Sequence, residues 1–227
     1  MPATDDLYFR QIEMGPMANF VYLIGSRSAR EAVVVDPAWS VKQVLDIAAA
    51  DGMRVTAALV SHFHPDHVGG NFMGQHIEGL VEFLELCKGR IHVHKAEAGA
   101  LPVPESETSP TDEHSRIEVG GIVIECIHTP GHTPGSQCFR VLDRVVSGDT
   151  LFIGSCGRTD LPGSDPGELY ESLTQKLMKL EENTLVYPGH NYSEEGTFSS
   201  IGKEKAHNPM VRFPSKAAFL AAMGYGR

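Results

Sequence analysis

A short stretch of this 227-residue chain concentrates side chains that bind metal ions: positions 61–67 hold three histidines and one aspartate. A proline follows His64 and biases it towards extended backbone, so His62 and His64 share a side and can converge on one ion. Asp66 and His67 are adjacent and point differently, which suits a second ion. The alternative is a polar loop with coincidental histidines, but burying so many titratable groups without a metal is costly. The pattern therefore predicts the start of two adjacent metal sites.

Three later segments each place one more candidate ligand after an expected strand. His132 lies in Thr-Pro-Gly-His-Thr-Pro-Gly-Ser, Asp149 in Ser-Gly-Asp-Thr and His190 in Tyr-Pro-Gly-His. Each segment alone is a weak signal, because proline and glycine beside histidine describe many turns. Their order and their position after strands make the joint signal strong. Since a carboxylate has two oxygens, Asp149 can offer one to each of two ions.

The first half of the chain predicts strands and helices that bring these ligands together. Apolar runs predict strands at 7–12, 19–24, 31–35, 55–60 and 91–94. Apolar residues at helical spacing predict helices at 40–52 and 72–88, and Ser40 with Gln43 has the spacing of a capping box. The stretch 101–115 is rich in proline, serine and acidic residues, so we expect a loop between two halves.

The second half repeats the order of strands, histidine-containing loop and helix. It predicts a hairpin at 117–127, two strands within 136–147 and a strand at 185–187. A helix is predicted from Asp165, an N-cap followed by proline, to Leu180. Two β-rich halves that face each other with helices outside predict an α/β fold, the four-layer αββα sandwich.

The order of the candidate ligands resembles that of the metallo-β-lactamase superfamily, in which an H-x-H-x-D-H run precedes single His, Asp and His ligands. The resemblance covers about residues 15–212. It implies that one ion is held by His62, His64 and His132. It implies that the other ion is held by Asp66, His67 and His190, and that Asp149 bridges the two. The fold it implies is the αββα sandwich of that superfamily.

The segment 148–160 is similar to particular branches of the superfamily. Its Gly-Asp-Thr-Leu-Phe and Gly-Arg-Thr-Asp sequences resemble the glyoxalase II (hydroxyacylglutathione hydrolase) branch. Its Cys-Gly-Arg-Thr-Asp sequence also resembles the persulfide dioxygenases. In those relatives a basic residue near this position contacts glutathione, so the resemblance implies a substrate-binding role for Arg158.

Two metal ions about 3.5 to 4 Å apart can share a water, lower its pKa and polarise a substrate carbonyl. The expected function is therefore metal-dependent hydrolysis by a bridging hydroxide, most readily of thioesters, because a thiolate leaves without a dedicated acid. Asp66 is the expected catalytic residue, since it can orient the water or take its proton. The expected cofactors are two divalent ions, zinc first, with iron or manganese as alternatives. The expected substrate is a small molecule, with glutathione or another thiol as carrier.

Two other functions stay open at this point. His62, His132 and Asp149 form a two-histidine, one-carboxylate set that suits a single Fe(II), as in a persulfide dioxygenase. A non-catalytic metal-binding module that serves a partner is the third possibility. Hydrolysis is favoured because the remaining ligand histidines have a direct use only in a dinuclear site.

Composition excludes several classes of protein. The net charge of −10 argues against nucleic-acid binding, which depends on Lys and Arg neutralising phosphates. We expect no membrane association, because no run of 18 apolar residues occurs and the acidic N-terminus does not resemble a signal peptide. Four cysteines without C-x-x-C spacing favour a reducing, cytoplasmic location. We expect one domain over 1–227, with 201–227 as a short C-terminal extension; the sequence does not predict an oligomeric state.

Six further histidines are expected to lie on the surface or in hydrogen bonds, not at the metal site. They are His76, His92, His94, His114, His128 and His207. His128 is the strongest competitor among them, because it lies four residues before His132.

Overall fold

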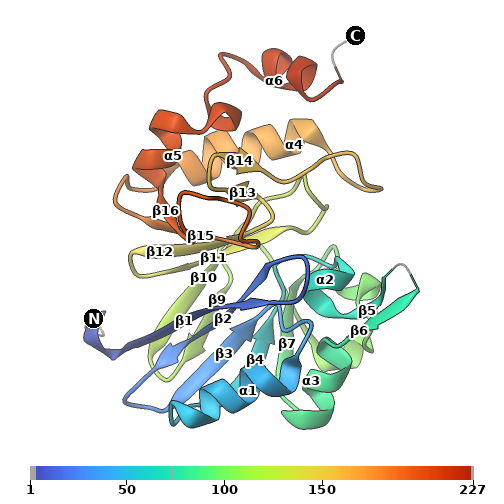
Figure 1. Cartoon of the computed structure of the whole chain (residues 1–227), viewed down its shortest axis with the longest axis vertical. Helices are drawn as coiled ribbons and strands as arrows, with labels where there is room; N and C mark the ends of the chain where they lie inside the picture. The colour runs from blue at the N-terminus through green and yellow to red at the C-terminus, as the bar shows by residue number, and fades with distance from the viewer. Residues whose placement is uncertain (1–3, 73, 226–227) are drawn as a thin grey trace.

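A computed structural model describes residues 4–72 and 74–225, with two six-stranded sheets facing each other and helices on their outer faces (Figure 1). The first sheet has the order β1 (Leu7–Met14), β2 (Asn19–Ser26), β3 (Glu31–Val35), β4 (Arg54–Leu59), β7 (Arg90–His94), β8 (Thr108–Thr111). Its first three strands are antiparallel, and β3, β4, β7 and β8 run parallel.

The second sheet has the order β16 (Ser199–Ser200), β15 (Leu185–Pro188), β12 (Arg144–Gly148), β11 (Gln137–Val141), β10 (Ile122–His128), β9 (Arg116–Val119). Strands β12 and β15 are parallel, and the other neighbours are antiparallel. Two small hairpins lie outside the main sheets: β5 (Gly70–Phe72) with β6 (Gln75–Ile77), and β13 (Leu151–Phe152) with β14 (Ser155–Cys156).

Strand β2 is buried along its whole length because its alternating side chains enter two different cores. Val21 and Leu23 pack in the cluster that includes residues of helices α1 (Val41–Ala50) and α3 (Leu80–Leu86). Phe20, Tyr22 and Ile24 pack with residues of the second sheet.

A third apolar cluster lies between the second sheet and helices α4 (Pro166–Glu171), α5 (Ile201–His207) and α6 (Lys216–Ala222). Three cores separate four layers, so the predicted αββα sandwich is confirmed; Figure 1 shows α1 and α3 on one side and α4 to α6 on the other. The predicted extension 201–227 contributes Ile201 and Phe219, both buried, to this cluster. Its residues up to 225 thus belong to an outer layer, and 226–227 lie outside the described residues.

The predicted helix at 72–88 is wrong in its first half. The hairpin β5–β6 precedes α3, which begins only at Leu80. Gly74 has a left-handed backbone, with φ +82°, that ends any helical run there. The carboxylate of Glu82 accepts the backbone N–H of Gly79 at 2.7 Å and so fixes the later start of the helix. Position 73 lies outside the described residues.

Two smaller predictions also differ from the structure. The expected loop 101–115 contains strand β8, which extends the first sheet beside β7. Ser40 makes no capping bond, and the carboxylate of Glu78 accepts the Val41 N–H at 3.2 Å in its place.

The third helix begins as predicted, since Asp165 accepts the N–H groups of Gly167 and Glu168. Its α-helical part ends at Glu171. A wider π turn, Ser172–Lys176, and a 3-10 turn, Leu177–Lys179, follow it.

The strands that carry the candidate ligands end at one edge of each sheet. Strands β3 and β4 are parallel, as are β12 and β15. Strand β10 runs in the direction of β12, because both are antiparallel to β11 between them. The segments that follow these strands therefore meet at one end of the sandwich. None of the helices in the described ranges has the length and apolarity needed to cross a membrane.

Candidate metal centre

The first set of candidate ligands is His62, His64 and His132, whose ring nitrogens lie within 4.8 Å of one another. His64 has extended backbone, with φ −62° and ψ 141°, as its following proline predicts, and it precedes the short helix α2 (Pro65–Val68). The loop after β10 brings His132 Nε2 to 3.0 Å from His64 Nδ1. Residues separated by nearly 70 positions thus form one cluster.

The second set is Asp66, His67 and His190, whose ligand atoms also lie within 4.8 Å of one another. Asp66 and His67 belong to α2, and His190 follows β15. The Nε2 atoms of His67 and His190 are 3.2 Å apart, and each lies 3.4 Å from Asp66 Oδ2. The adjacent residues of the H-x-H-x-D-H run therefore serve a different cluster from its first two histidines.

Asp149 lies between the two sets. Its Oδ2 atom is 3.7 Å from His132 Nε2 and 3.3 Å from His190 Nε2, and its Oδ1 atom is 3.4 Å from His67 Nε2. A Cβ on Gly189 would lie 2.2 Å from Asp149 Oδ1, so the glycine before His190 permits this approach. The structure thus brings together all seven predicted ligands.

The donor set fits divalent cations. Four buried side-chain atoms have no hydrogen-bond partner within the described ranges, and two of them, His62 Nε2 and Asp149 Oδ1, belong to this site. Leaving such atoms unpaired is costly, and a cation would satisfy both. Imidazole nitrogens with carboxylate oxygens suit zinc, and iron is also compatible with this set.

Backbone carbonyls fix the orientation of two ligand imidazoles. His132 Nδ1 donates to the Arg158 carbonyl at 2.8 Å, and His190 Nδ1 donates to the Met17 carbonyl at 2.9 Å. Because Nδ1 carries the proton in each bond, the Nε2 lone pair is available on the opposite side of the ring.

Asp36, which the sequence analysis missed, supports both sets. Its Oδ2 accepts from His67 Nδ1 at 3.0 Å and from the Ser61 hydroxyl at 2.6 Å. The Ser61 oxygen in turn lies 3.0 Å from His62 Nδ1 and accepts from it. Asp36, His62 and His67 also lie close enough together to form a third potential metal cluster. The hydrogen bonds of Asp36 to His67 and, through Ser61, to His62 account for this grouping as support for the two ligands. An aspartate directly after buried strand β3 was the signal available in the sequence.

Asn19 was also missed. Its side-chain N–H donates to Asp66 Oδ2 at 3.0 Å, and its own Oδ1 accepts the indole N–H of Trp39 at 2.8 Å. The amide is therefore held in one orientation and holds the carboxylate beside the second set. A single asparagine at the start of a strand offers no signal in sequence.

The two sets differ in their electrostatics. Burial and the neighbouring imidazoles lower the pKa of His62 well below its usual value and that of His64 to about 4. Burial alone would lower the pKa of His67 too, but Asp66 and Asp149 raise it to about 9. The same two carboxylates outweigh burial at His190 and raise its pKa to about 10. Conversely, these histidines outweigh burial at Asp66 and Asp149 and lower the pKa of each carboxyl.

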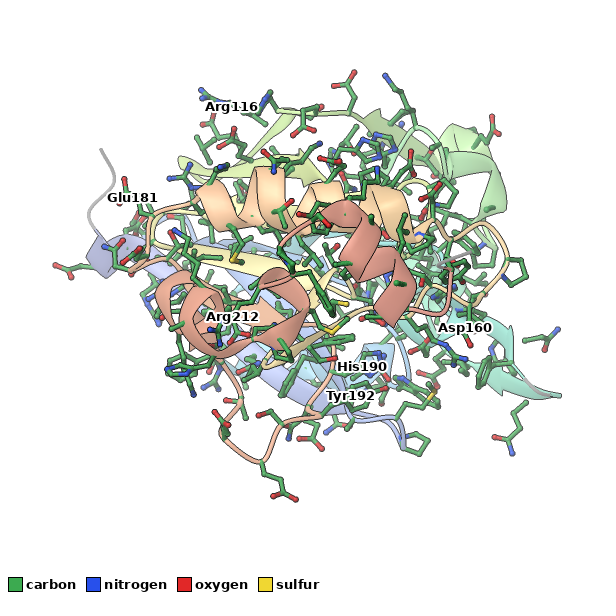
Figure 2. The ribbon with its side chains drawn as sticks, turned by 90° about the horizontal axis from the view of Figure 1, so that it is seen from above. Arg116, Asp160, Glu181, His190, Tyr192 and Arg212 are labelled. Atoms are coloured by element: carbon green, nitrogen blue, oxygen red, sulfur yellow. The ribbon has the colours of Figure 1, made fainter. Side chains whose placement is uncertain are left out.

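A pocket of about 680 Å³ opens onto both sets. Apolar or aromatic residues form much of its wall: Met17, Phe72, Phe152, Ile153, Leu161 and Tyr192. Tyr192 stacks on His190 with ring centroids 4.5 Å apart, and Figure 2 shows the two side chains next to each other. The volume suits a small-molecule substrate.

Arg158 lines this pocket, but its guanidinium is engaged. It pairs with both carboxylate oxygens of Asp160 at 2.6 Å, and its side chain is 62% exposed. Its backbone carbonyl is the one that accepts from His132.

Four of the other six histidines take part in contacts away from the ligand sets. His128 stacks on His94 with centroids 3.8 Å apart, and its Nε2 donates to the Pro134 carbonyl. His76 and His114 pair with Glu82 and Glu125.

Known proteins are similar to this chain over nearly its whole length. A model of the metallo-beta-lactamase superfamily matches residues 14–190. The chain is 30% identical to human "Persulfide dioxygenase ETHE1, mitochondrial", over 96% of this chain and 81% of that protein. It is 27% identical to the Bacillus subtilis "Probable polyketide biosynthesis zinc-dependent hydrolase PksB", over 89% of this chain and 85% of that protein. The crystal structure of ETHE1 from Myxococcus xanthus superposes with a TM-score of 0.83 at 32% identity, covering 96% of this chain and 90% of that one.

Proposed function

The chain belongs to the metallo-beta-lactamase superfamily, and from that premise we propose that it is a hydrolase that uses two divalent metal ions to cleave a thioester. His62, His64 and His132 would hold one ion, and Asp66, His67 and His190 the other. Asp149 would bridge them. Zinc is the proposed metal, with iron or manganese as alternatives.

One observation carries the dinuclear proposal: Asp149 lies within 3.7 Å of imidazoles from both sets. A mononuclear site would leave three well-placed ligands of the second set without a direct role. Two buried histidines beside two carboxylates offer a second cation both nitrogen and oxygen donors.

When bound, two such ions supply a water of lowered pKa and polarise the substrate carbonyl. The chain's own residues orient the reactants. Asp66 lines the pocket, and Asn19 holds one of its oxygens. The carboxylate is therefore placed to orient a water molecule or to accept its proton at the free oxygen.

The choice of a thioester follows from the pocket's weak supply of general acids. Outside the ligand sets, the described pocket residues with a titratable O–H or S–H are Tyr192 and Cys156, and burial raises the pKa of each to about 12. Neither is poised to protonate a poor leaving group near neutral pH. A thiolate needs no such proton.

The proposed thiol carrier is glutathione or a similar small thiol, and Arg158 is the proposed contact. Arg158 is the one Lys or Arg side chain among the described residues that line the pocket. Its pairing with Asp160 means that an anionic carrier would have to compete with that carboxylate.

Metal analysis together with two activity assays tests the proposal. Protein purified without chelator should contain about two ions per chain and hydrolyse thioesters. One iron per chain, with oxygen consumption on a persulfide and no thioester cleavage, would overturn it.

That opposite outcome defines the second candidate, a mononuclear Fe(II) persulfide dioxygenase. A specific observation favours it: the two unpartnered atoms of the site, His62 Nε2 and Asp149 Oδ1, both belong to the His62, His132, Asp149 set that suits iron. The similarity to human persulfide dioxygenase supports the same candidate.

A further inference from the structure

Glu97 is a buried carboxylate that the proposed mechanism does not use. Its side chain is only 2% exposed, and it follows β7 at the start of a short 3-10 turn, Ala98–Ala100. Its backbone is fixed by its N–H, which donates to the His94 carbonyl, and by its own carbonyl, which accepts from Ala100. The side chain is therefore aimed by an ordered segment.

The carboxylate contacts the loop that carries His132. Its Oε1 atom accepts from the hydroxyl of Thr133 and from the N–H of Gly135 at 2.8 Å. A Cβ on Gly135 would lie 2.6 Å from Glu97 Cγ, so the side chain packs directly against this backbone. Thr133 is the residue after His132, and the loop is thus held at its ligand.

The second oxygen of this carboxylate, Oε2, is buried and has no hydrogen-bond partner within 4–72 and 74–225. Burial outweighs the bonds from Thr133 and Gly135 and raises the pKa of Glu97 to about 7. The fold thus keeps a carboxyl beside the His132 loop despite its cost.

We propose that Glu97 is a positioning residue that holds the His132 loop and so sets the place of His132 in the first ligand set. The inference rests on the proposed metal centre. Among the described residues no hydrogen bond joins Glu97 to the second set, which is held by Asn19, Asp36 and the Met17 carbonyl. Its effect should therefore be confined to one of two ions.

The test is competitive titration of metal-free protein with Zn²⁺ against a chromogenic chelator. Glu97→Ala should lower the affinity for one Zn²⁺ ion by about 10- to 100-fold, the usual cost of losing a partner of metal ligands. The affinity for the other ion should not change. Glu97→Gln should recover most of the affinity, because its amide oxygen still accepts from Thr133 and Gly135. Thr133→Val removes the hydroxyl donor to Glu97 and should lower the affinity for the same ion by a smaller factor. This variant serves as the test if Glu97→Ala does not fold.

Variants that keep only one of the two ligand sets identify which ion is affected. In His190→Asn protein, which keeps the first set, adding Glu97→Ala should weaken the remaining ion. In His64→Asn protein, which keeps the second set, it should have no effect.

Glu204 provides a matched control, since it is equally buried at 2% exposed and accepts from Gly154 and Asn208 away from the ligand loops. Glu204→Ala should lower the melting temperature while leaving both metal affinities unchanged. The inference fails if Glu97→Ala binds both ions like wild type, weakens both equally, or is not rescued by Glu97→Gln. Wild-type protein that binds no zinc would instead overturn the proposed function.

Discussion

The two ligand sets lie side by side but offer an incoming cation different surroundings. The first contains three imidazoles, and His62 and His64 have lowered pKa values, so both are neutral near pH 7. The second contains a carboxylate, and the carboxylates beside His67 and His190 raise the pKa of both, so this pair retains protons more readily than His62 and His64 do. An ion that binds His62 and His64 displaces no proton from them near pH 7, whereas an ion that binds the second set must displace protons from the His67–His190 pair.

The supports of the two sets differ in the same way. The first set depends on the Arg158 carbonyl and, by our inference, on Glu97. The second depends on Asn19, at the start of β2, and on the carbonyl of Met17, in the turn before it. Asp149 lies beside both sets, and Asp36 bonds directly to His67 and through Ser61 to His62. Substitutions can therefore be chosen that affect both ligand sets, one set or neither.

Asp149→Ala should have the largest effect, because it removes the side chain shared by both sets. Partners of metal ligands are commonly worth about 10- to 100-fold in affinity, so a shared ligand should cost more than about 100-fold in kcat/KM and most of both ions. Elemental analysis and steady-state kinetics measure this. Asp143→Ala, at an exposed carboxylate on the turn before β12, is the control. If Asp149→Ala kept two ions per chain, the proposed bridging role of Asp149 would be contradicted.

His62→Ala and His132→Ala should each abolish activity and release one ion, while circular dichroism shows an intact fold, because ligands on loops serve the ion more than the core. His190→Ala should release one ion and lower hydrolysis by more than about tenfold. It should lose less metal than Asp149→Ala. His114→Ala is the control at an exposed histidine. Full activity in His190→Ala with one iron bound would favour the oxygenase.

Metal affinity should depend more steeply on pH at the second set than at the first. The carboxylates raise the pKa of His67 and His190, so the second ion must displace protons from this pair and its affinity should fall as pH falls, about tenfold per unit for each proton displaced. His62 and His64 have lowered pKa values and are neutral in this range, so they add no pH dependence to the first ion from about pH 6.5 to 8.5. Chelator competition at several pH values measures both constants. Parallel pH slopes for the two ions would contradict the difference between the sets.

Arg158→Ala should have the smallest effect and leave metal content unchanged, since His132 uses the backbone carbonyl at this position and not the guanidinium. If the guanidinium contacts an anionic carrier, KM for that thioester should rise about tenfold and KM for a neutral thioester should not. Asp160→Ala, which frees the guanidinium, should lower KM for the anionic substrate. Equal changes in KM for the anionic and the neutral thioester would mean that the Arg158–Asp160 pair fixes the loop conformation and does not bind the carrier.

The sequence alone determined the family, the four-layer fold and the identity of seven candidate ligands. It could do so because these features depend on local patterns: strand-like apolar runs, a dense H-x-H-x-D-H segment, and turns that follow strands. The start of the third helix could also be predicted from the sequence, because Asp165 caps it through hydrogen bonds to residues two and three positions away. The early end of the same helix was not.

Only the tertiary structure decided how the ligands are supported. Asp36, Asn19 and Glu97 look ordinary in sequence, and each acts on residues 25 or more positions away. The hairpin at 70–77 and strand β8 were missed for the same reason, since a partner strand or a distant cap overrides weak local preference. The contrast between neutral and protonated imidazoles likewise arises from burial and from carboxylates brought close by folding, which a list of residue types does not contain.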